Sequence, residues 1–254
     1  MIQRNKTTGT ERQIRRRPMF RITKQINDPS SGDLPNEIPV RASASLDVPP
    51  YWDKHGTGEN SSFKIVKIQP AGRTAEEFGK VQNRFTETMA PEDYKILSIK
   101  RIQNLELWEG YQWKYNWMKK KTNNSSKSFE KLLFHGTKDE YVDAIVRQGF
   151  DWRLSGMSTG TLYGKGSYFA RDANYSSNYA NSRMFLVRVL VGDYICGKRT
   201  YLVPPNKPGS DTDRYHSCVD NMQHPSIFVT FEHQQAYPEY IITYSYEKKV
   251  VKGQ

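Results

Sequence analysis

The sequence predicts an α+β protein with two packed, largely antiparallel sheets and flanking helices. Two observations lead to this class. Two segments of the first half carry apolar residues at helical intervals, over 74–89 and 105–121. The second half is instead a series of short runs rich in β-branched and aromatic residues, with few helical patterns between them.

The chain divides into three zones. Residues 1–24 are polar but contain a Thr8-Gly9-Thr10 turn between two short extended runs, which predicts a hairpin. Residues 25–47 are rich in Pro, Ser, Asp and Asn without apolar periodicity, as expected of a linker. Aromatic and aliphatic residues are dense from there on, so we expect the folded domain over 48–247.

The first helix of this domain is expected after Thr74, which has capping-box spacing with Glu77, and its apolar stripe continues to Met89. A strand follows over 94–102. The next helix covers 105–121, and we expect its aromatic stripe to lie in the core because that is the usual place for such a stripe.

An apolar strand over 131–135 leads into a second capping box at 137–140 and a helix that ends at Gly149. The glycine-rich segment 155–166 predicts a loop that is mobile or turns tightly. Pro238 predicts that the last strand enters at an edge or an irregular point. The later strands are expected over 184–191, 226–231 and 240–246.

Composition argues against several classes of protein. No run of about 18 apolar residues could span a membrane, and the N-terminus lacks the apolar region of a secretory signal. The two cysteines and five histidines have neither the spacing of a disulfide framework nor that of a metal site. We therefore expect an intracellular protein, in the nucleus, the cytoplasm or both, without a structural metal.

The net charge of +11 is concentrated at the N-terminus. Residues 1–24 hold eight Lys or Arg and one Glu, so they carry +7, and the other 230 residues carry only +4. Arg15-Arg16-Arg17 could contact phosphate or act as a nuclear import patch, or it could be a solvated basic segment. Nucleic-acid binding through this segment is therefore one alternative function, with a steep salt dependence as its signature.

A few residues of the second half could bind a ligand. His135 ends an apolar strand beside Gly136, so a ring nitrogen and an unobstructed backbone are available there. Tyr168, Tyr175 and Tyr179 could stack on a flat heterocycle, which contributes about 0.5–1.5 kcal/mol per pair. On spacing alone, packing in the core is the commoner role for each of these residues. The sequence also has no P-loop, Gly-x-Ser-x-Gly or His-Glu-x-x-His motif that would indicate another kind of active site.

Several motifs in a fixed order favour a ligand-binding role for these residues over packing alone. They are Phe134-His135-Gly136-Thr137, Tyr163-Gly164-Lys165-Gly166-Ser167-Tyr168-Phe169-Ala170, Ser176-Ser177-Asn178-Tyr179 and Tyr237-Pro238-Glu239-Tyr240. Together they resemble the catalytic domain of poly(ADP-ribose) polymerases, over residues 48–246, and most of all its mono-ADP-ribosylating branch with WWE and CCCH-finger modules. The resemblance implies the ADP-ribosyltransferase fold, NAD⁺ as co-substrate without a metal, and protein acceptors, among them the chain itself.

The same resemblance implies roles for single residues. His135 would bond a ribose hydroxyl of NAD⁺, and the Gly136 backbone and Ser176 hydroxyl would hold the carboxamide. Tyr179 would stack on the nicotinamide ring, and Tyr168 would close the other side near the ribose. A further NAD⁺ contact is implied for Arg153, in a donor loop over 153–163.

The third position of the family's His-Tyr-Glu triad falls on Ile227. In chain-forming members the glutamate there activates the incoming ribose hydroxyl, and isoleucine has no lone pair with which to do so. The resemblance therefore implies transfer of single ADP-ribose units. Glu239 and Glu232 lie beyond this position and are expected to be structural. A pseudoenzyme that binds NAD⁺ or ADP-ribose without transferring it is the other alternative.

Residues 1–24 resemble the closing strands of a WWE domain. About twenty residues without the tryptophans of that module cannot build a core of their own. We therefore expect a WWE remnant, in a chain that is either a fragment of a longer protein or the product of a truncated gene model.

Overall fold

The computed structural model describes residues 2–4, 11–13, 47–55, 62–90, 92–121, 129–154 and 161–246, in two units, 1–45 and 46–254. In the first unit β1 (Ile2–Arg4) pairs antiparallel with β2 (Glu11–Gln13), which confirms the two strands of the predicted hairpin. The predicted linker lies outside the described residues, apart from Asp47.

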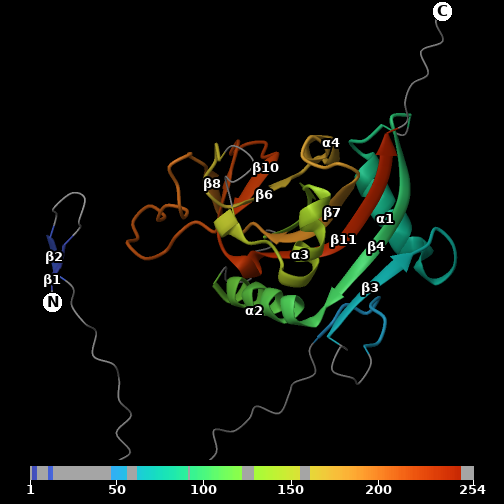
Figure 1. Ribbon diagram of the computed structural model, residues 1–254, viewed down its shortest axis with the longest axis horizontal. Coiled ribbons are helices and arrows are strands. Elements are labelled where there is room, and N and C mark those ends of the chain that lie inside the picture. Colours follow the sequence, from blue (N-terminus) through green and yellow to red (C-terminus); the bar gives the residue numbers. More distant parts are fainter. Residues whose placement is uncertain are drawn as a thin grey trace, which may run out of the picture. The chain divides into compact units, whose positions relative to one another are not determined.

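The second unit is built on one nine-stranded sheet, in the order β3-β4-β11-β7-β5-β6-β10-β9-β8 (Figure 1). All neighbours are antiparallel except β8 and β9, so the α+β class is confirmed. The strands are β3 (Phe63–Ile68), β4 (Tyr94–Asn104), β5 (Glu130–Gly136), β6 (Ser167–Ala170), β7 (Arg183–Leu190), β8 (Tyr194–Cys196), β9 (Ser217–Val219), β10 (Ile227–Thr230) and β11 (Ala236–Tyr246). The helices are α1 (Ala75–Thr86), α2 (Leu105–Lys121), α3 (Asp139–Gln148) and α4 (Ala173–Ser177), with short 3₁₀ turns η1 (Gly72–Thr74), η2 (Trp152–Leu154) and η3 (His233–Gln235).

The sheet is almost divided between β5 and β6. These strands share one registered pair, Phe134 with Ala170, whereas β5 and β7 share seven. The two sheets expected from the sequence are thus the two halves of one hydrogen-bonded sheet. The short strand β6 pairs along its whole length with β10, so the smaller half is held together independently of β5.

Helices cover both faces of the larger half. Leu133 packs in a cluster with Val142 of α3, and Phe134 packs in another with Phe85 of α1. Consecutive strand residues point to opposite faces, so α1 and α3 lie on opposite sides of the sheet, as Figure 1 also shows. Full burial of a side chain of this size stabilises the fold by about 1.5–3 kcal/mol, so β5 is anchored from both sides.

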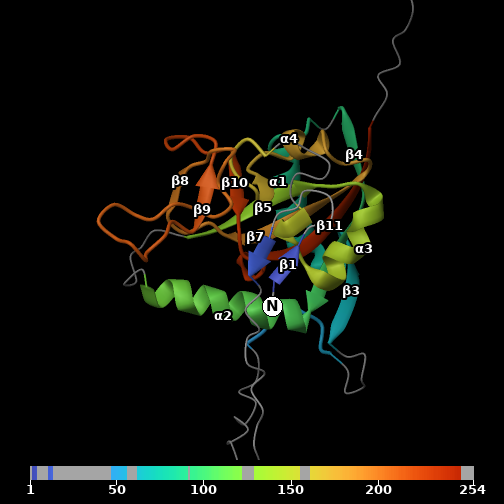
Figure 2. The ribbon, with the colours of Figure 1, turned by 60° about the vertical axis from the view of Figure 1, so that its left-hand side comes forward.

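The aromatic stripe of α2 lies in the core, as predicted. Trp108 and Tyr111 stack with ring centroids 5.6 Å apart and pack against Tyr237 of β11. The helix lies across one end of the sheet (Figure 2). Within the described ranges, no helix is long and apolar enough to cross a membrane.

Both predicted capping boxes are wrong. The Thr74 hydroxyl instead accepts a hydrogen bond from the Gln69 amide at 2.8 Å, and α1 has no side-chain cap. Lys138 rather than Thr137 is the N-cap of α3, and it makes no capping bond. The spacing rule fails here because it cannot see a competing partner such as Gln69.

The ends of two later elements agree with their sequence signals. Gly149 follows α3 with φ of 75°, a left-handed value that glycine adopts without strain, so the predicted stop is confirmed. The register of β11 shifts between Pro238 and Tyr240, which confirms the predicted irregular point. This strand begins at Ala236, earlier than predicted, because the bulge lets pairing continue past the proline.

Candidate functional site

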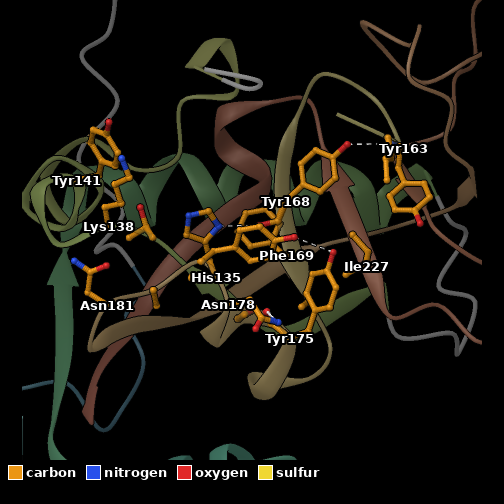
Figure 3. Close-up of a pocket in the computed structure, with 17 residues that line it drawn as sticks. His135, Lys138, Tyr141, Tyr163, Tyr168, Phe169, Tyr175, Asn178, Asn181 and Ile227 are labelled. Atoms are coloured by element: carbon orange, nitrogen blue, oxygen red, sulfur yellow. Dashed lines mark hydrogen bonds between the residues drawn. The ribbon is translucent and has the colours of Figure 1, made fainter. Parts of the chain in front are cut away.

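A cavity of about 480 Å³ opens where β5 ends, beside the junction of the two sheet halves. Figure 3 shows Lys138 and Tyr141 at one end of it, Tyr163 and Ile227 at the other, and His135 between them. Its walls come from the end of β5, the start of α3, β6, α4 with the turn that follows, and β10. The predicted site residues His135, Gly136, Tyr168, Ser176, Tyr179 and Ile227 all line this cavity.

His135 is fixed by a bond to the backbone of β6. Its Nδ1 lies 2.8 Å from the carbonyl oxygen of Tyr168. A carbonyl only accepts, so Nδ1 must carry the proton and the Nε2 lone pair of the neutral ring is left to accept another bond. Burial lowers the pKa of His135, which keeps the ring neutral at pH 7. The ring also packs edge-on against Phe150 at 4.9 Å between centroids.

Gly136 lets β5 approach α4 closely. A Cβ at this position would lie 1.8 Å from the carbonyl oxygen of Ser176 and 3.2 Å from the Cβ of Tyr179. Any other residue would therefore push α4 and the turn after it away from β5. The close approach is what brings the buried Ser176 and the half-exposed Tyr179 to the same cavity as His135.

Tyr168 braces the loop in front of β6. Its hydroxyl donates to the Gly164 carbonyl at 2.8 Å and accepts from the Tyr163 amide at 3.0 Å. Both of these bonds are internal to the protein, so the ring rather than the hydroxyl is the part of Tyr168 that faces a ligand. Burial raises the pKa of this phenol, which stays protonated at neutral pH.

A second pair of tyrosines forms the open side of the cavity. The rings of Tyr175 and Tyr179 lie 5.6 Å apart at 47°, with their hydroxyl oxygens 3.3 Å apart. Both side chains are more than two-fifths exposed. Flat, accessible rings at the mouth of a cavity suit stacking on a heterocycle.

Ile227 makes one wall of the cavity apolar. It is the first residue of β10, 4% exposed, and pairs with Ala170 of β6. Lys138 is the charged residue among the described residues that line the cavity, and no carboxylate is found among them. The described lining thus offers a neutral ring nitrogen, bare backbone and stacking rings, without a carboxylate.

The two nearby glutamates are engaged elsewhere. Glu239 is 1% exposed and pairs with Arg188 at 2.9 Å, and Glu232 pairs with Lys114 at 2.6 Å. Neither lines the cavity. Their expected structural role agrees with these contacts.

Arg153 is the predicted site residue that the structure does not bring to the cavity. It lies in η2, pairs with Asp151 at 2.7 Å and is 74% exposed. Residues 155–160 of the predicted donor loop lie outside the described part of the chain. Conversely, Lys138 and Tyr141 line the cavity although they were not predicted to do so. Their place in the sequence could have predicted this, because both follow directly after the His135 motif, at the start of the helix α3.

Comparisons with known proteins agree with this geometry. Residues 75–202 match the family described as Poly(ADP-ribose) polymerase catalytic domain. The chain is 41% identical to protein mono-ADP-ribosyltransferase PARP12 of Mus musculus over 98% of its length and 34% of that protein. It is 38% identical to protein mono-ADP-ribosyltransferase PARP11 of Homo sapiens, over 96% of this chain and 73% of the relative. It is 39% identical to protein mono-ADP-ribosyltransferase PARP14 of Homo sapiens, over 79% of this chain and 11% of that relative.

The chain therefore spans about a third of the PARP12 sequence and about three quarters of the PARP11 sequence. The matched range runs from α1 to the loop after β8 and includes every cavity wall except β10. With the cavity and these matches in agreement, the chain belongs to the poly(ADP-ribose) polymerase catalytic domain family.

Proposed function

We propose that this protein transfers single ADP-ribose units from NAD⁺ to protein side chains and releases nicotinamide. One observation carries the proposal: His135, Gly136, Ser176, Tyr179 and Ile227 line one cavity, and its described lining has no carboxylate. The resemblance aligns Ile227 with the glutamate of chain-forming enzymes. The names of the relatives, which are mono-ADP-ribosyltransferases, support the same reading.

The residues of the cavity fit NAD⁺. Its volume, about 480 Å³, falls in the range usual for small-molecule sites. The nicotinamide carboxamide would bond the bare Gly136 backbone and the Ser176 hydroxyl, with the pyridine ring on Tyr179. The Tyr168 ring would close the other side, and the Nε2 lone pair of His135 would accept a bond from a ribose hydroxyl.

Bound NAD⁺ supplies the ADP-ribose: the bond from ribose C1′ to the pyridine nitrogen breaks, nicotinamide leaves with the electron pair, and an acceptor oxygen bonds C1′. An ionised aspartate or glutamate needs no base for this step, whereas a hydroxyl acceptor must lose a proton. The described lining has no carboxylate, and its neutral imidazole, His135, is assigned to a ribose hydroxyl of NAD⁺. We therefore expect carboxylate acceptors, including carboxylates on the protein's own surface.

Labelled NAD⁺, followed by a denaturing gel, tests the proposal. The purified chain should give a discrete labelled band that is lost in His135→Ala, while thermal unfolding reports whether that variant is folded. A high-molecular-weight smear would contradict single transfer. No label in either lane, with NAD⁺ binding intact, would favour the pseudoenzyme instead.

A further inference from the structure

The division of the sheet creates a second cavity, of about 660 Å³, next to the first. One side is β5 from Glu130 to Leu133, and the other is residues 223–225 with Phe228 of β10. The strand pair Phe134–Ala170 lies between the two cavities: His135 and Ile227 line the first, whereas Leu133 and Phe228 line the second. Figure 2 shows β5 and β10 in this neighbouring arrangement.

This cavity occupies the place of a missing strand. On one side β5 pairs with β7 along all seven of its residues. On the other side the chain leaves the sheet after Ala170, so no strand of the described residues lies beside Glu130–Leu133. Alternate residues of a strand direct their N–H and C=O groups to opposite sides, so part of this stretch presents unpaired backbone groups to the cavity. An extended peptide can satisfy them by adding as a strand.

Charge and polarity indicate the kind of peptide. Four cationic side chains line the cavity, and its one carboxylate, Glu130, already accepts hydrogen bonds from Tyr111 and Arg188. The cationic residues are Arg84, Lys131, Arg171 and Arg188.

Three of the four cations already have a carboxylate partner. Arg84 pairs with Glu87, Arg171 with Asp172 and Arg188 with Glu239. Lys131 is the exception in the described part of the chain: it is exposed, forms no ion pair there, and has its Nζ 5.9 Å from the Phe228 ring centroid. It is therefore the cation free to pair with an acidic ligand. Leu132, 39% exposed, gives an apolar contact on the opposite face of the strand, so an added peptide would meet charge on one face and an apolar side chain on the other.

We propose that this second cavity is a docking groove for an extended acidic peptide, which adds as a strand to the free edge of β5. The inference rests on the proposed function, because the peptide would be the acceptor. Leu133 and His135 are two residues apart, about 7 Å along a strand. A peptide held beside Leu133 therefore ends close to the cavity that holds NAD⁺, and its following residues must leave the line of the strand and pass around Ala170 to bring a carboxylate there.

Peptide binding without NAD⁺ tests the groove apart from catalysis. A fluorescent peptide in which glutamate alternates with valine should bind, and the matched peptide with lysine in place of glutamate should not. Lys131→Glu should weaken binding by about tenfold or more, through lost attraction and added repulsion. Lys100→Glu makes the same charge change on an exposed residue of β4 and should not weaken it. Equal binding by the two variants would overturn the inference.

Amide hydrogen exchange locates the bound peptide. Exchange should slow within 130–133, at the alternate residues whose amides point away from β7 and would be covered by the added strand. The sheet ends at β3 and at β8, and β3 serves as the internal comparison. Slowing at β3 instead, or at neither edge, would contradict the proposed position.

The two proposals can fail separately. If the chain modifies proteins while Lys131→Glu binds peptide as the parent does, the groove is wrong and the transferase stands. If the acidic peptide binds and protects 130–133 but no ADP-ribose is transferred, the groove stands and the transferase is wrong.

Discussion

The Nδ1 atom of His135 donates to the carbonyl oxygen of Tyr168 at 2.8 Å, which joins two site residues that lie 33 positions apart. The bond crosses from the end of β5 to β6, the point where the sheet is almost divided. It sets the tautomer of the imidazole and so decides which nitrogen can accept a bond from a ligand. The weak junction of the sheet is thus also the place where the two halves of the site are aligned.

Transfer should fall on the acid side of the pH profile as His135 gains a proton. Protonation removes the Nε2 lone pair, and burial holds the pKa of His135 below its ordinary 6.5. The inflection in kcat/KM should therefore lie below pH 6.5, with no loss between pH 7 and 8 from this group. His135→Gln, with weaker activity, should lack the inflection; if the variant keeps it, another group is responsible.

The lowered pKa of His135 also makes the free energy of unfolding depend on pH. A histidine with a lowered pKa in the folded state contributes stability that is complete above about pH 6.5, the unfolded value. The contribution is lost as pH falls toward the folded pKa, because the unfolded chain then binds the extra proton. The free energies of unfolding of the parent and of His135→Gln, measured in urea, should differ by a constant amount above pH 6.5. Below pH 6.5 the parent should lose stability relative to the variant, and a difference that stays constant there would contradict the assignment.

Tyr168→Phe should loosen the loop in front of β6 without removing the ring from the cavity. It deletes the bonds to Gly164 and Tyr163, each contributing about 0.5–1.5 kcal/mol. We expect KM for NAD⁺ to rise by about tenfold, with a smaller change in kcat. Tyr115→Phe on α2, away from the cavity, is the matched control. A large loss of kcat at unchanged KM would mean that the hydroxyl acts on the substrate.

The sequence predicted local structure better than the contacts that make the site. α2 was predicted to the residue because its aromatic stripe is a local, periodic signal. β6 was missed, since Ser167–Ala170 is short and becomes a strand only by pairing with β10, about sixty residues away along the chain. The motifs named most of the site, but the close approach of Gly136 to α4 has no sequence signature beyond the glycine itself.

Gly136→Ala should disrupt this approach. The new methyl would overlap the Ser176 carbonyl, so α4 must shift and the carboxamide site with it. We expect a loss of about 1–3 kcal/mol in the free energy of unfolding and no detectable NAD⁺ binding by calorimetry. Gly79→Ala on α1 is the matched control: its Cβ would meet nothing within 4 Å, and it should gain about 0.5–1 kcal/mol. Unchanged NAD⁺ binding by Gly136→Ala would show that the contact is dispensable.

Ile227→Glu should not make a polymerase. The site is 4% exposed and packs with Ala170 and Val229, and Lys138, the cation in the described lining, is at the opposite end of the cavity (Figure 3). Burial should raise the pKa of the new side chain and lower the melting temperature, and the loss should deepen as pH rises and the group ionises. Ile227→Gln is polar but carries no charge, so it separates the cost of burying a polar group from the cost of ionisation. On a gel with labelled NAD⁺ both variants should give a discrete band or none. Long chains from Ile227→Glu would mean that the acceptor geometry for elongation already exists, and that Ile227 alone prevents it.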